Sequence, residues 1–564
     1  MNTQIDNPLE RARHWLEQDP DPETARELSE LIERAEAGNQ ESRALLEQKF
    51  STRLSFGTAG IRGPLGSGPA AMNRIVVSQT TAGLAAFLIG HHHSSAQPLR
   101  VVVGYDARKN SAVFARDTAE VLSGYGIEVL LTPHEVPTPI VAFAVRHLDC
   151  DAGVMITASH NPPEDNGYKV YFGGADEGSQ IVPPIDAGIE AEILAIAATL
   201  RFDAIPRTDE LIHATPSGLI ADYISHTMTA VAPADEPASA PTVVYTPMHG
   251  VGGDTFLAVL KAAGLQAPVV VEEQFRPDPL FPTVAFPNPE EKGALHLAFA
   301  RARDTHADLI IAHDPDADRL AVALPDGSSP SGYTSLTGNQ VGAILGWRAA
   351  ETAQKTGQTG ALANSIVSSP WLGKIAEHFD LSHQETLTGF KYVSRVPYLL
   401  FGFEEALGYL VDPQVVRDKD GISAALAIID LVNQMDGKGK TLWDYLTTIE
   451  ETVGAFASGQ ITIKIDPTKA DTPITDVLRA KQPARIGEHV VVSADDFMTG
   501  INDVPKDNIL RYYLADGSRV IVRPSGTEPK NKVYLDTAGT SRPDAEAALR
   551  SLENAVRSLL ESLS

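Results

Sequence analysis

The sequence is poor in cysteine, in long apolar runs and in positive charge. Its 564 residues contain one cysteine, Cys150, so an intramolecular disulfide and a cysteine metal cluster are both excluded. No apolar run approaches the roughly 20 residues of a membrane-spanning helix. The first residues lack the basic and apolar regions of a signal peptide. These absences predict a cytoplasmic protein without a membrane partner.

Acidic residues outnumber basic residues by 73 to 46, which gives a formal net charge of −27. Nucleic acids and anionic membranes are bound by basic surfaces, so this balance argues against either as the main partner. If the substrate is a phosphate ester, its site must be a local group of arginines and lysines in an acidic molecule.

Short β-branched runs alternate with alanine- and leucine-rich stretches along most of the chain. Five such runs lie at 99–106, 127–133, 152–159, 241–247 and 307–314. The alternation is typical of βαβ units with buried, largely parallel strands, which bind ligands at their carboxyl ends. The sequence therefore predicts an α/β protein.

Chain length and turn-rich breaks predict four domains. Their expected limits are 1–205, 206–328, 329–445 and 446–564. The first three domains show the same repeated order of strand, loop and helix. The last combines a β-rich stretch with a final helix, which predicts a smaller α+β domain.

One strand is expected to end at Ser159, in the segment TASHNPP at 157–163 that NGYK at 166–169 soon follows. A serine hydroxyl is a poor nucleophile and needs a base or a preorganised charge environment. His160 and Lys169 could supply either. The alternative is a turn in which Ser159 merely hydrogen-bonds the backbone. Ser159 is therefore a candidate nucleophile.

A second strand leads into Asp314, Asp316 and Asp318, three carboxylates at alternate positions. Such oxygen ligands can converge on one hard cation such as Mg²⁺. An EF-hand calcium loop is excluded, because its sixth position would be Arg319 instead of Gly and its twelfth Pro325 instead of Glu. A phosphatase that forms an aspartyl phosphate on the first carboxylate stays open.

Three further segments carry charge beside glycines or hydroxyls. RPSGTEPK, which starts at Arg523, could cradle a phosphate. Glu404 and Glu405 in GFEEALGY could accept hydrogen bonds from sugar hydroxyls or begin a helix. GTAGIRG is a glycine-rich turn that carries Arg62.

Six motifs together resemble the α-D-phosphohexomutase superfamily of phosphoglucomutases and phosphomannomutases. In chain order they are GTAGIRG, TASHNPPEDNGYK, DPDADR, TGFK at 388–391, FEEALG and RPSGTEPK. They span nearly the whole chain. The resemblance implies four domains around a central cleft, three of them α/β/α units of shared topology and the fourth a smaller α+β domain.

The resemblance also implies a phosphorylated serine, Ser159. Asp314, Asp316 and Asp318 would hold Mg²⁺ together with an oxygen of the serine phosphate, and Arg319 would help to hold the phosphoserine region. The first domain would then carry the phosphoserine loop and the second the metal loop.

Further roles follow from the same resemblance. Arg62 and Lys169 match cations implicated in proton transfer and charge stabilisation. The acid/base stays open between His160, Lys169, Lys391 and a shared arrangement. The remaining candidates bind the sugar or its second phosphate, and they are Gly389, Lys391, Glu404, Arg523, Ser525, Gly526 and Thr527.

The expected reaction interconverts hexose 1-phosphate and hexose 6-phosphate through a sugar 1,6-bisphosphate, which would also act as activator. Glucose is favoured over mannose. Ala406 stands where many phosphoglucomutases carry a serine, so a pentose phosphate is a close alternative. A non-catalytic sugar-phosphate sensor is a further one. The substrate is a small phosphosugar, and the protein is expected to be a monomer or a homodimer.

Overall fold

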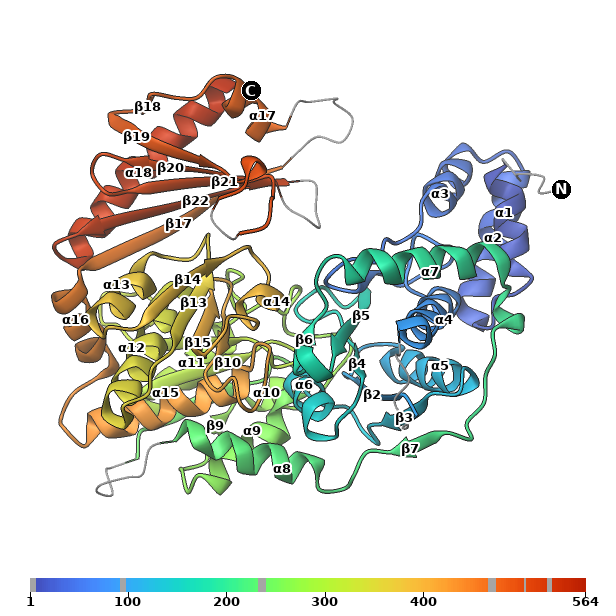
Figure 1. The fold of residues 1–564 in the computed structure, drawn as a ribbon, viewed down its shortest axis with the longest axis horizontal. Coiled ribbons are helices and arrows are strands. Elements are labelled where there is room, and N and C mark those ends of the chain that lie inside the picture. Colours follow the sequence, from blue (N-terminus) through green and yellow to red (C-terminus); the bar gives the residue numbers. More distant parts are fainter. Residues whose placement is uncertain are drawn as a thin grey trace. The chain divides into compact units, whose positions relative to one another are not determined.

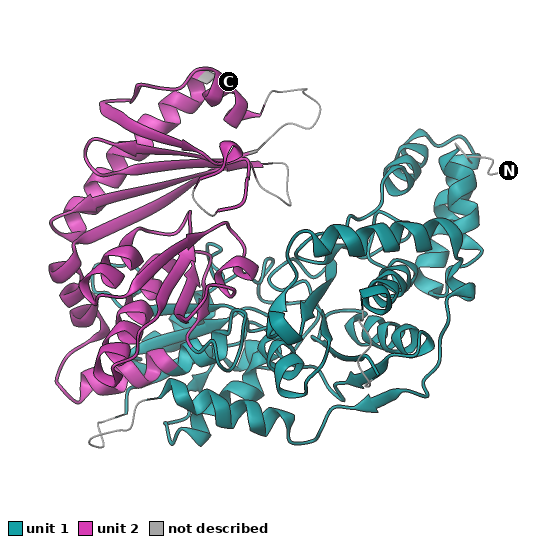
Figure 2. Ribbon diagram, in the orientation of Figure 1, with its two compact units in different colours: residues 1–233, 240–335, 412–426 teal, residues 234–239, 336–411, 427–564 magenta. Residues whose placement is uncertain are grey.

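The architecture is that of a computed structural model, which describes residues 7–91, 98–231, 240–464, 473–501, 504–524 and 530–563. The chain forms two compact units (Figure 2). Unit 1 contains Met1–Pro233, Ala240–Ser335 and Asp412–Leu426. Among the described residues, unit 2 consists of those within Leu336–Val411 and Ala427–Ser564.

Unit 1 contains two mixed sheets (Figure 1). The strands of the first are β1 (Ile61–Pro64), β2 (Arg100–Tyr105), β3 (Glu128–Leu131), β4 (Ala152–Ile156), β5 (Asp165–Phe172), β6 (Ser179–Gln180) and β7 (Ile212–Ala214). The strands of the second are β8 (Val243–Thr246), β9 (Val269–Val270), β10 (Leu309–His313), β11 (Leu320–Pro325) and β12 (Tyr333–Ser335).

Unit 2 contains one mixed and one antiparallel sheet. The mixed sheet consists of β13 (Ala361–Ser365), β14 (Ser382–Thr386), β15 (Leu399–Glu404) and β16 (Gly408–Leu410). The antiparallel sheet consists of β17 (Ala455–Lys464), β18 (Arg485–Ile486), β19 (His489–Asp496), β20 (Leu510–Leu514), β21 (Arg519–Pro524) and β22 (Lys530–Gly539).

The three mixed sheets share one strand order. Their common parts read β3-β2-β4-β5, β9-β8-β10-β11 and β14-β13-β15-β16. In each, the first three strands are parallel and the fourth is antiparallel to the third. This confirms the predicted shared topology of three α/β units. The turn between the third and fourth strands therefore recurs at the same place, at 157–164, 314–319 and 405–407.

Helices cover the first sheet on both faces. The helix α6 (Thr138–His147) packs against β2 and β4, and α5 (Ser111–Gly124) packs against the same strands and β3. Figure 1 shows the sheet between α6 on one side and α4 and α5 on the other. The other helices of this part are α1 (Pro8–Leu16), α2 (Pro22–Glu36), α3 (Gln40–Ser51), α4 (Arg74–His91) and α7 (Ile185–Thr199).

The remaining helices lie in the parts of the chain that contain the other three sheets. They are α8 (Leu219–Thr227), α9 (Gly252–Ala262), α10 (Glu272–Phe275), α11 (His296–Thr305), α12 (Gly338–Thr356), α13 (Trp371–His378), α14 (Phe390–Val393), α15 (Gly421–Asp436), α16 (Leu442–Val453), α17 (Ile474–Ala480) and α18 (Arg542–Leu563). Short 3₁₀ turns lie at Gly174–Asp176, Phe202–Ala204, Met228–Ala230 and Phe497–Thr499. Among the described helices, none is long and apolar enough to cross a membrane.

The antiparallel sheet and α18 confirm the predicted α+β fold of the last part of the chain. Leu552, Val556 and Leu560 of α18 recur at helical spacing and join one core cluster with sheet residues such as Val520 and Val533. The four predicted domain limits stay a prediction, because compactness divides the chain into the two units instead.

Glu385 joins the two sheets of unit 2. It lies on β14 and its carboxylate accepts hydrogen bonds from Arg511 Nη1 (2.6 Å) on β20 and Arg519 Nη1 (3.0 Å) on β21. Arg519 also pairs with Asp536 (2.7 Å). Burial favours a higher pKa of Glu385, but the two arginines outweigh burial and lower that pKa below its ordinary value of 4.5.

We expect Glu385→Gln to lower the free energy of unfolding of unit 2 at pH 7 by about 3 kcal/mol. Because the pKa of Glu385 is lower in the folded state, its stabilisation is present above about pH 4.5 and is lost as the pH falls further. The two proteins should therefore converge in acid. Thermal unfolding across this pH range measures the difference. Glu377→Gln, which alters an exposed pair with Lys374, is the control, and equal midpoints at pH 7 would contradict the prediction.

Candidate active site

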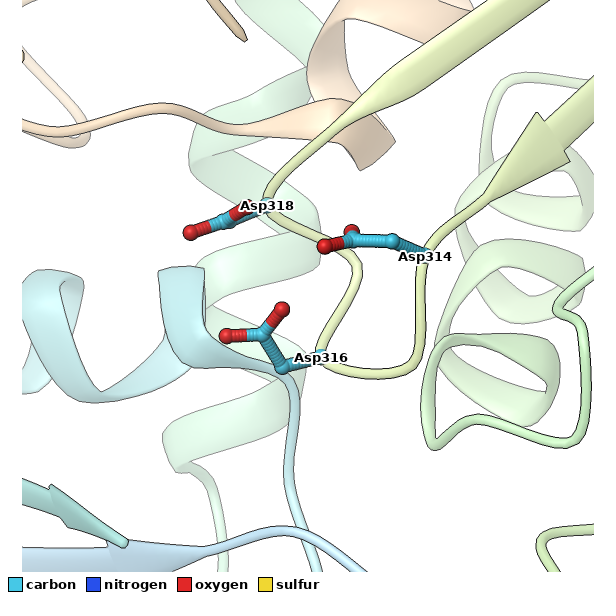
Figure 3. A group of neighbouring side chains, drawn as sticks. All are labelled: Asp314, Asp316 and Asp318. Atoms are coloured by element: carbon cyan, nitrogen blue, oxygen red, sulfur yellow. The ribbon is translucent and has the colours of Figure 1, made fainter. Parts of the chain in front are cut away.

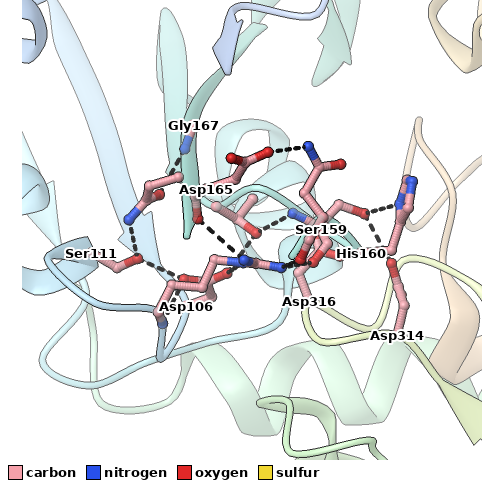
Figure 4. Close-up of polar contacts among 12 residues, drawn as sticks. Asp106, Ser111, Ser159, His160, Asp165, Gly167, Asp314 and Asp316 are labelled. Carbon is pink, nitrogen blue, oxygen red and sulfur yellow. Dashed lines mark hydrogen bonds and ion pairs between the residues drawn. The ribbon is translucent and has the colours of Figure 1, made fainter. Parts of the chain in front are cut away.

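The first recurrent turn carries the candidate nucleophile. Strand β4 ends at Ile156 and delivers Ser159, which is 5% exposed and has a backbone φ of +51°. Its Oγ donates a hydrogen bond to Asp314 Oδ2 (2.9 Å) and lies 3.2 Å from His160 Nδ1 (Figure 4). The serine is therefore buried at a strand end, with a carboxylate and an imidazole beside its hydroxyl.

The second recurrent turn gathers the three aspartates. One oxygen from each of Asp314, Asp316 and Asp318 lies within 4.8 Å of the others (Figure 3), and all three residues are buried. Within the described part of the chain, Asp316 Oδ1 and Asp318 Oδ1 are buried without a hydrogen-bond partner. Unpartnered buried carboxylate oxygens are costly unless a cation binds them. The turn therefore fits a hard divalent cation.

The electrostatics of this cluster support the same fit. Burial, together with the charges of Asp316 and Asp318, raises the pKa of Asp314 well above its ordinary value. Burial would also raise the pKa of Asp318, but Lys169, Lys419 and Arg319 outweigh it and hold that pKa well below its ordinary value. A divalent cation would remove the repulsion between the carboxylates.

Two lysines neutralise part of this acidic cluster. Lys169 on β5 contacts Asp316 Oδ2 (2.7 Å) and Asp318 Oδ2 (2.9 Å). Burial would lower the pKa of Lys169, but these two carboxylates raise it well above its ordinary value. Lys419 lies 3.3 Å from Asp318 Oδ2. Both lysines are therefore cations beside the candidate metal ligands.

His160 is a neutral ring beside Ser159. Burial, and then the charges of Arg319 and Arg62, lower its pKa well below the ordinary value. Arg62 lies on β1, which pairs with β5. This pairing requires Gly60, because a Cβ there would come within 1.7 Å of the Tyr168 carbonyl oxygen. The turn thus brings Arg62 toward the serine loop, which is the segment at 157–165.

The metal-binding turn is fixed from several sides. The Arg319 N–H donates to Asp314 Oδ1 (3.0 Å), and Thr138 Oγ1 at the start of α6 donates to Asp316 Oδ2 (2.6 Å). Gly421 lies against the same turn, where a Cβ would come within 2.4 Å of the Arg319 carbonyl oxygen. The segment at 412–426, which belongs to unit 1, therefore contributes to this site.

Glu404 is the last residue of β15, directly before the third recurrent turn, in unit 2. Its Oε1 accepts a hydrogen bond from the Gly389 N–H (2.7 Å), so the sugar-binding candidates of TGFK and FEEA are adjacent. Lys391 lies beside the Tyr392 ring, at 5.2 Å. The neighbouring Glu405 accepts hydrogen bonds from Ser365 (3.1 Å) and Ser368 (3.0 Å). Glu404 and Glu405 therefore have different hydrogen-bond partners.

The phosphate-cradle candidates are only partly described. Arg523 lies on β21, one residue before the strand ends, and its Nη1 donates a hydrogen bond to Thr388 Oγ1 of the TGFK segment. Ser525, Gly526 and Thr527 lie outside the described residues. Among the described candidates, unit 1 brings together Ser159, His160, Lys169, Arg62, Asp314, Asp316, Asp318 and Arg319. Unit 2 brings together Gly389, Glu404 and Lys391, and Arg523 with Thr388.

Sequence reasoning missed several residues of the site. Arg108 and Asp106 contact the serine loop, Thr138 contacts Asp316, and Lys419 contacts Asp318. In the run GYDARK at 104–109, an acidic and two basic residues follow the end of β2 at Tyr105. A polar segment at a strand end is the same signal that selected Ser159 and Asp314. Thr138 has no such signal.

The site combines a buried serine, a candidate cation site of three carboxylates and several cationic side chains in a repeated α/β fold. Comparison with known proteins identifies the family in which this combination occurs. The phosphoglucomutase/phosphomannomutase family matches the chain in order: alpha/beta/alpha domains I at 53–199, II at 221–327 and III at 337–452, and the C-terminal domain at 475–549. These matches define a phosphosugar mutase, an isomerase. The chain belongs to the phosphoglucomutase/phosphomannomutase family.

Individual relatives carry several mutase names. The "Probable phosphomannomutase" of Haemophilus influenzae is 48% identical, over 87% of this chain and 98% of its own length. The "Phosphopentomutase" of Homo sapiens is 34% identical, over 97% and 94%. The "Phosphoglucomutase" of Staphylococcus epidermidis is 34% identical, over 87% and 91%. The crystal structure of a family protein from Burkholderia thailandensis shares the fold, with a TM-score of 0.67 and 18% identity over 90% of this chain and 97% of its own.

Proposed function

We propose that this mutase interconverts the 1-phosphate and 6-phosphate of glucose, and also of mannose, through a phosphorylated Ser159 and a sugar 1,6-bisphosphate. The observation that carries the proposal is the contact of Ser159 Oγ with Asp314 (2.9 Å), beside the two unpartnered oxygens of Asp316 and Asp318. A phosphate on Oγ would lie against the cation site.

The proposed reaction has two transfers. In the first, the bond between phosphorus and Ser159 Oγ breaks, Oγ takes up a proton, and phosphorus bonds to the oxygen of the free sugar hydroxyl, whose proton passes to a base. The bisphosphate then reorients in the site, and its other phosphoryl group returns to Oγ, which gives up its proton, while the released sugar oxygen takes up a proton. We propose His160 as the proton acceptor, because its lowered pKa leaves the ring neutral. We propose that Lys169 stabilises negative charge, because its raised pKa keeps it a cation.

Asp314, Asp316 and Asp318 would hold Mg²⁺, with an oxygen of the serine phosphate. When bound, this ion neutralises charge on the transferring phosphoryl group. Arg62 and Arg319 would hold the same group.

The sugar side of the proposal rests on unit 2. Glu404, Gly389 and Lys391 would bind the sugar, and Arg523 with the loop residues Ser525, Gly526 and Thr527 would bind the phosphate that is not reacting. The hydrogen bond from the Gly389 N–H to Glu404 Oε1 (2.7 Å) supports the assignment of both residues to one sugar-binding site.

The wider setting also stays a proposal. The four domains would divide at 205, 328 and 445, each contributing one loop to catalysis. The protein would act in the cytoplasm as a monomer or homodimer, without nucleic acid. The net charge of −27 supports the exclusion of nucleic acid.

A pentose phosphate is the second candidate substrate. Three observations favour it: Ala406 in the sugar-binding turn, the human relative named phosphopentomutase, and the "Phosphoribomutase" of Saccharomyces cerevisiae at 34% identity over 96% of this chain. The 48% identity to the H. influenzae protein named for phosphomannose favours the hexose.

Rates on different sugar phosphates test this choice. We expect kcat/KM on glucose 1-phosphate to exceed that on ribose 1-phosphate by about tenfold or more, since a polar site discriminates against a substrate that leaves its groups unpaired. Mannose 1-phosphate should lie between them. A coupled assay with catalytic glucose 1,6-bisphosphate measures all three, and omission of the bisphosphate tests its role as activator. A faster reaction with ribose 1-phosphate would contradict the hexose assignment, and binding without turnover would identify a sensor.

A phosphatase with Asp314 as nucleophile is less well supported by the geometry. Asp314 Oδ1 accepts a hydrogen bond from the Arg319 N–H and Oδ2 accepts one from Ser159 Oγ. Both oxygens are therefore engaged in the folded protein.

A further inference from the structure

From the geometry around Ser159 we infer that Arg108 is a positioning residue, which shapes the backbone of the serine loop for phosphoryl transfer. The inference rests on the proposed role of Ser159 and extends it to a side chain outside the reacting groups. Arg108 follows β2 and is 4% exposed.

The guanidinium of Arg108 lies at the centre of the serine loop. Its Nη2 donates to the carbonyl oxygens of Ser159 (2.6 Å) and Asn161 (2.5 Å). Its Nη1 donates to those of Pro162 (2.8 Å) and Asp165 (3.2 Å). Four carbonyl groups of one loop thus converge on one side chain.

Asp106 anchors both the arginine and the loop. Its Oδ2 lies 3.4 Å from Arg108 Nε and accepts a hydrogen bond from Thr157 Oγ1 (2.6 Å). The same Thr157 Oγ1 accepts a hydrogen bond from the Ser159 N–H (2.9 Å). Asp106 Oδ1 is held by Ser111 Oγ (2.6 Å), so the whole network is fixed to the start of α5 (Figure 4). Both the N–H and the carbonyl of Ser159 are therefore held from one place.

These hydrogen bonds to the Ser159 backbone are needed because Ser159 has an unfavourable backbone conformation. A φ of +51° lies in the left-handed region, which residues with a Cβ rarely adopt. Such a conformation persists only where surrounding contacts impose it. Here the bonds from Arg108 and Thr157 impose it, and in this conformation Oγ reaches Asp314 (2.9 Å).

The face of the guanidinium is covered as well as its edges. The guanidinium carbon lies 4.9 Å from the centre of the Phe281 ring, a buried side chain from the part of unit 1 that contains the second sheet. A planar guanidinium offers five N–H donors and a stacking face, and a lysine ammonium offers neither arrangement. Because its Nη1 and Nη2 groups donate to carbonyl oxygens of the serine loop, Arg108 differs from Arg62 and Arg319, which are the candidates for binding phosphate.

The test compares Arg108→Lys with the wild-type protein. The first readout is the single-turnover rate at which glucose 1,6-bisphosphate phosphorylates dephosphorylated Ser159, followed by mass spectrometry. The second is the Mg²⁺ affinity by calorimetry. We expect the transfer rate to fall about 100-fold, because small displacements of a reacting group have effects of that size. The Mg²⁺ affinity of the dephosphorylated protein should stay unchanged, since Arg108 donates to the serine loop and not to the three aspartates.

Arg116→Lys is the matched control, because Arg116 lies on the exposed side of α5 and pairs with Glu120 (2.7 Å). It should leave both readouts unchanged. If Arg108→Lys does not fold, Asp106→Asn, which preserves side-chain shape, should lower the same transfer rate by about tenfold.

An unchanged transfer rate in the variant that folds would overturn the inference. A parallel loss of Mg²⁺ affinity would overturn it too, since it would show general damage to the site. A wild-type protein that fails to phosphorylate Ser159 would instead contradict the proposed function, so the two failures are distinguishable.

Discussion

Ser159→Ala is expected to lower the mutase rate by at least about 10⁵-fold, because removal of a covalent nucleophile has effects of this order. Without Oγ there is no acceptor for the phosphoryl group, and the sugar bisphosphate cannot be regenerated. The fold should persist, since the Ser159 backbone bonds to Arg108 and Thr157 do not involve the hydroxyl. The coupled assay measures the rate, and mass spectrometry of the digested protein measures phosphate on the loop peptide.

Ser217→Ala, at an exposed position in the same unit, is the control and should retain full activity. If Ser159→Ala stays active, the phosphoserine mechanism is wrong. A hydroxylamine-labile phosphate on Asp314 in the wild-type protein would instead identify an aspartyl phosphatase.

Asp318→Asn is expected to lower the rate by about 10³-fold and to weaken Mg²⁺ binding in parallel. The substitution removes one negative charge and exchanges a carboxylate oxygen for an amide nitrogen, which binds no hard cation. It also removes a negative charge that balances the positive charges of Lys169 and Lys419, since both lysines contact Asp318 Oδ2. Calorimetric titration with Mg²⁺ and the coupled assay measure the two effects.

Removal of the metal with a chelator should match the variant, and added Mg²⁺ should restore only the wild-type protein. Asp304→Asn alters an exposed carboxylate on α11 of the same unit and should change nothing. Full activity of the wild-type protein in excess chelator would be incompatible with the proposed cation site.

The functional residues at the strand ends could be predicted from the sequence, but the contacts between distant segments could not. Ser159 and Asp314 could be found because each follows a buried strand, and parallel strands place their carboxyl ends at one edge. Their 2.9 Å contact could not be derived, because it joins two different sheets. The shared topology of three units was also within reach, since the strand–helix rhythm repeats.

Residues that act through the backbone escaped prediction. Arg108 stands in GYDARK without a motif of its own, and its importance appears only when four carbonyl groups of a loop 51 to 57 residues away converge on it. Lys419 escaped for a related reason. Its segment follows the third mixed sheet in sequence but is part of unit 1, and strand periodicity contains no information on such an exchange.

The recurrent turn has an evolutionary consequence. Ser159, Ala317 and Leu407, one in each of the three turns, all have a positive φ, at +51°, +55° and +62°. A triplicated scaffold of this kind confines innovation to a few peptide units, while the sheets beneath can stay as they are. Exchange of residues 404–407 should therefore retune sugar preference without rebuilding the nucleophile or the cation site. A family that bears glucose, mannose and pentose names is what such modular divergence would produce.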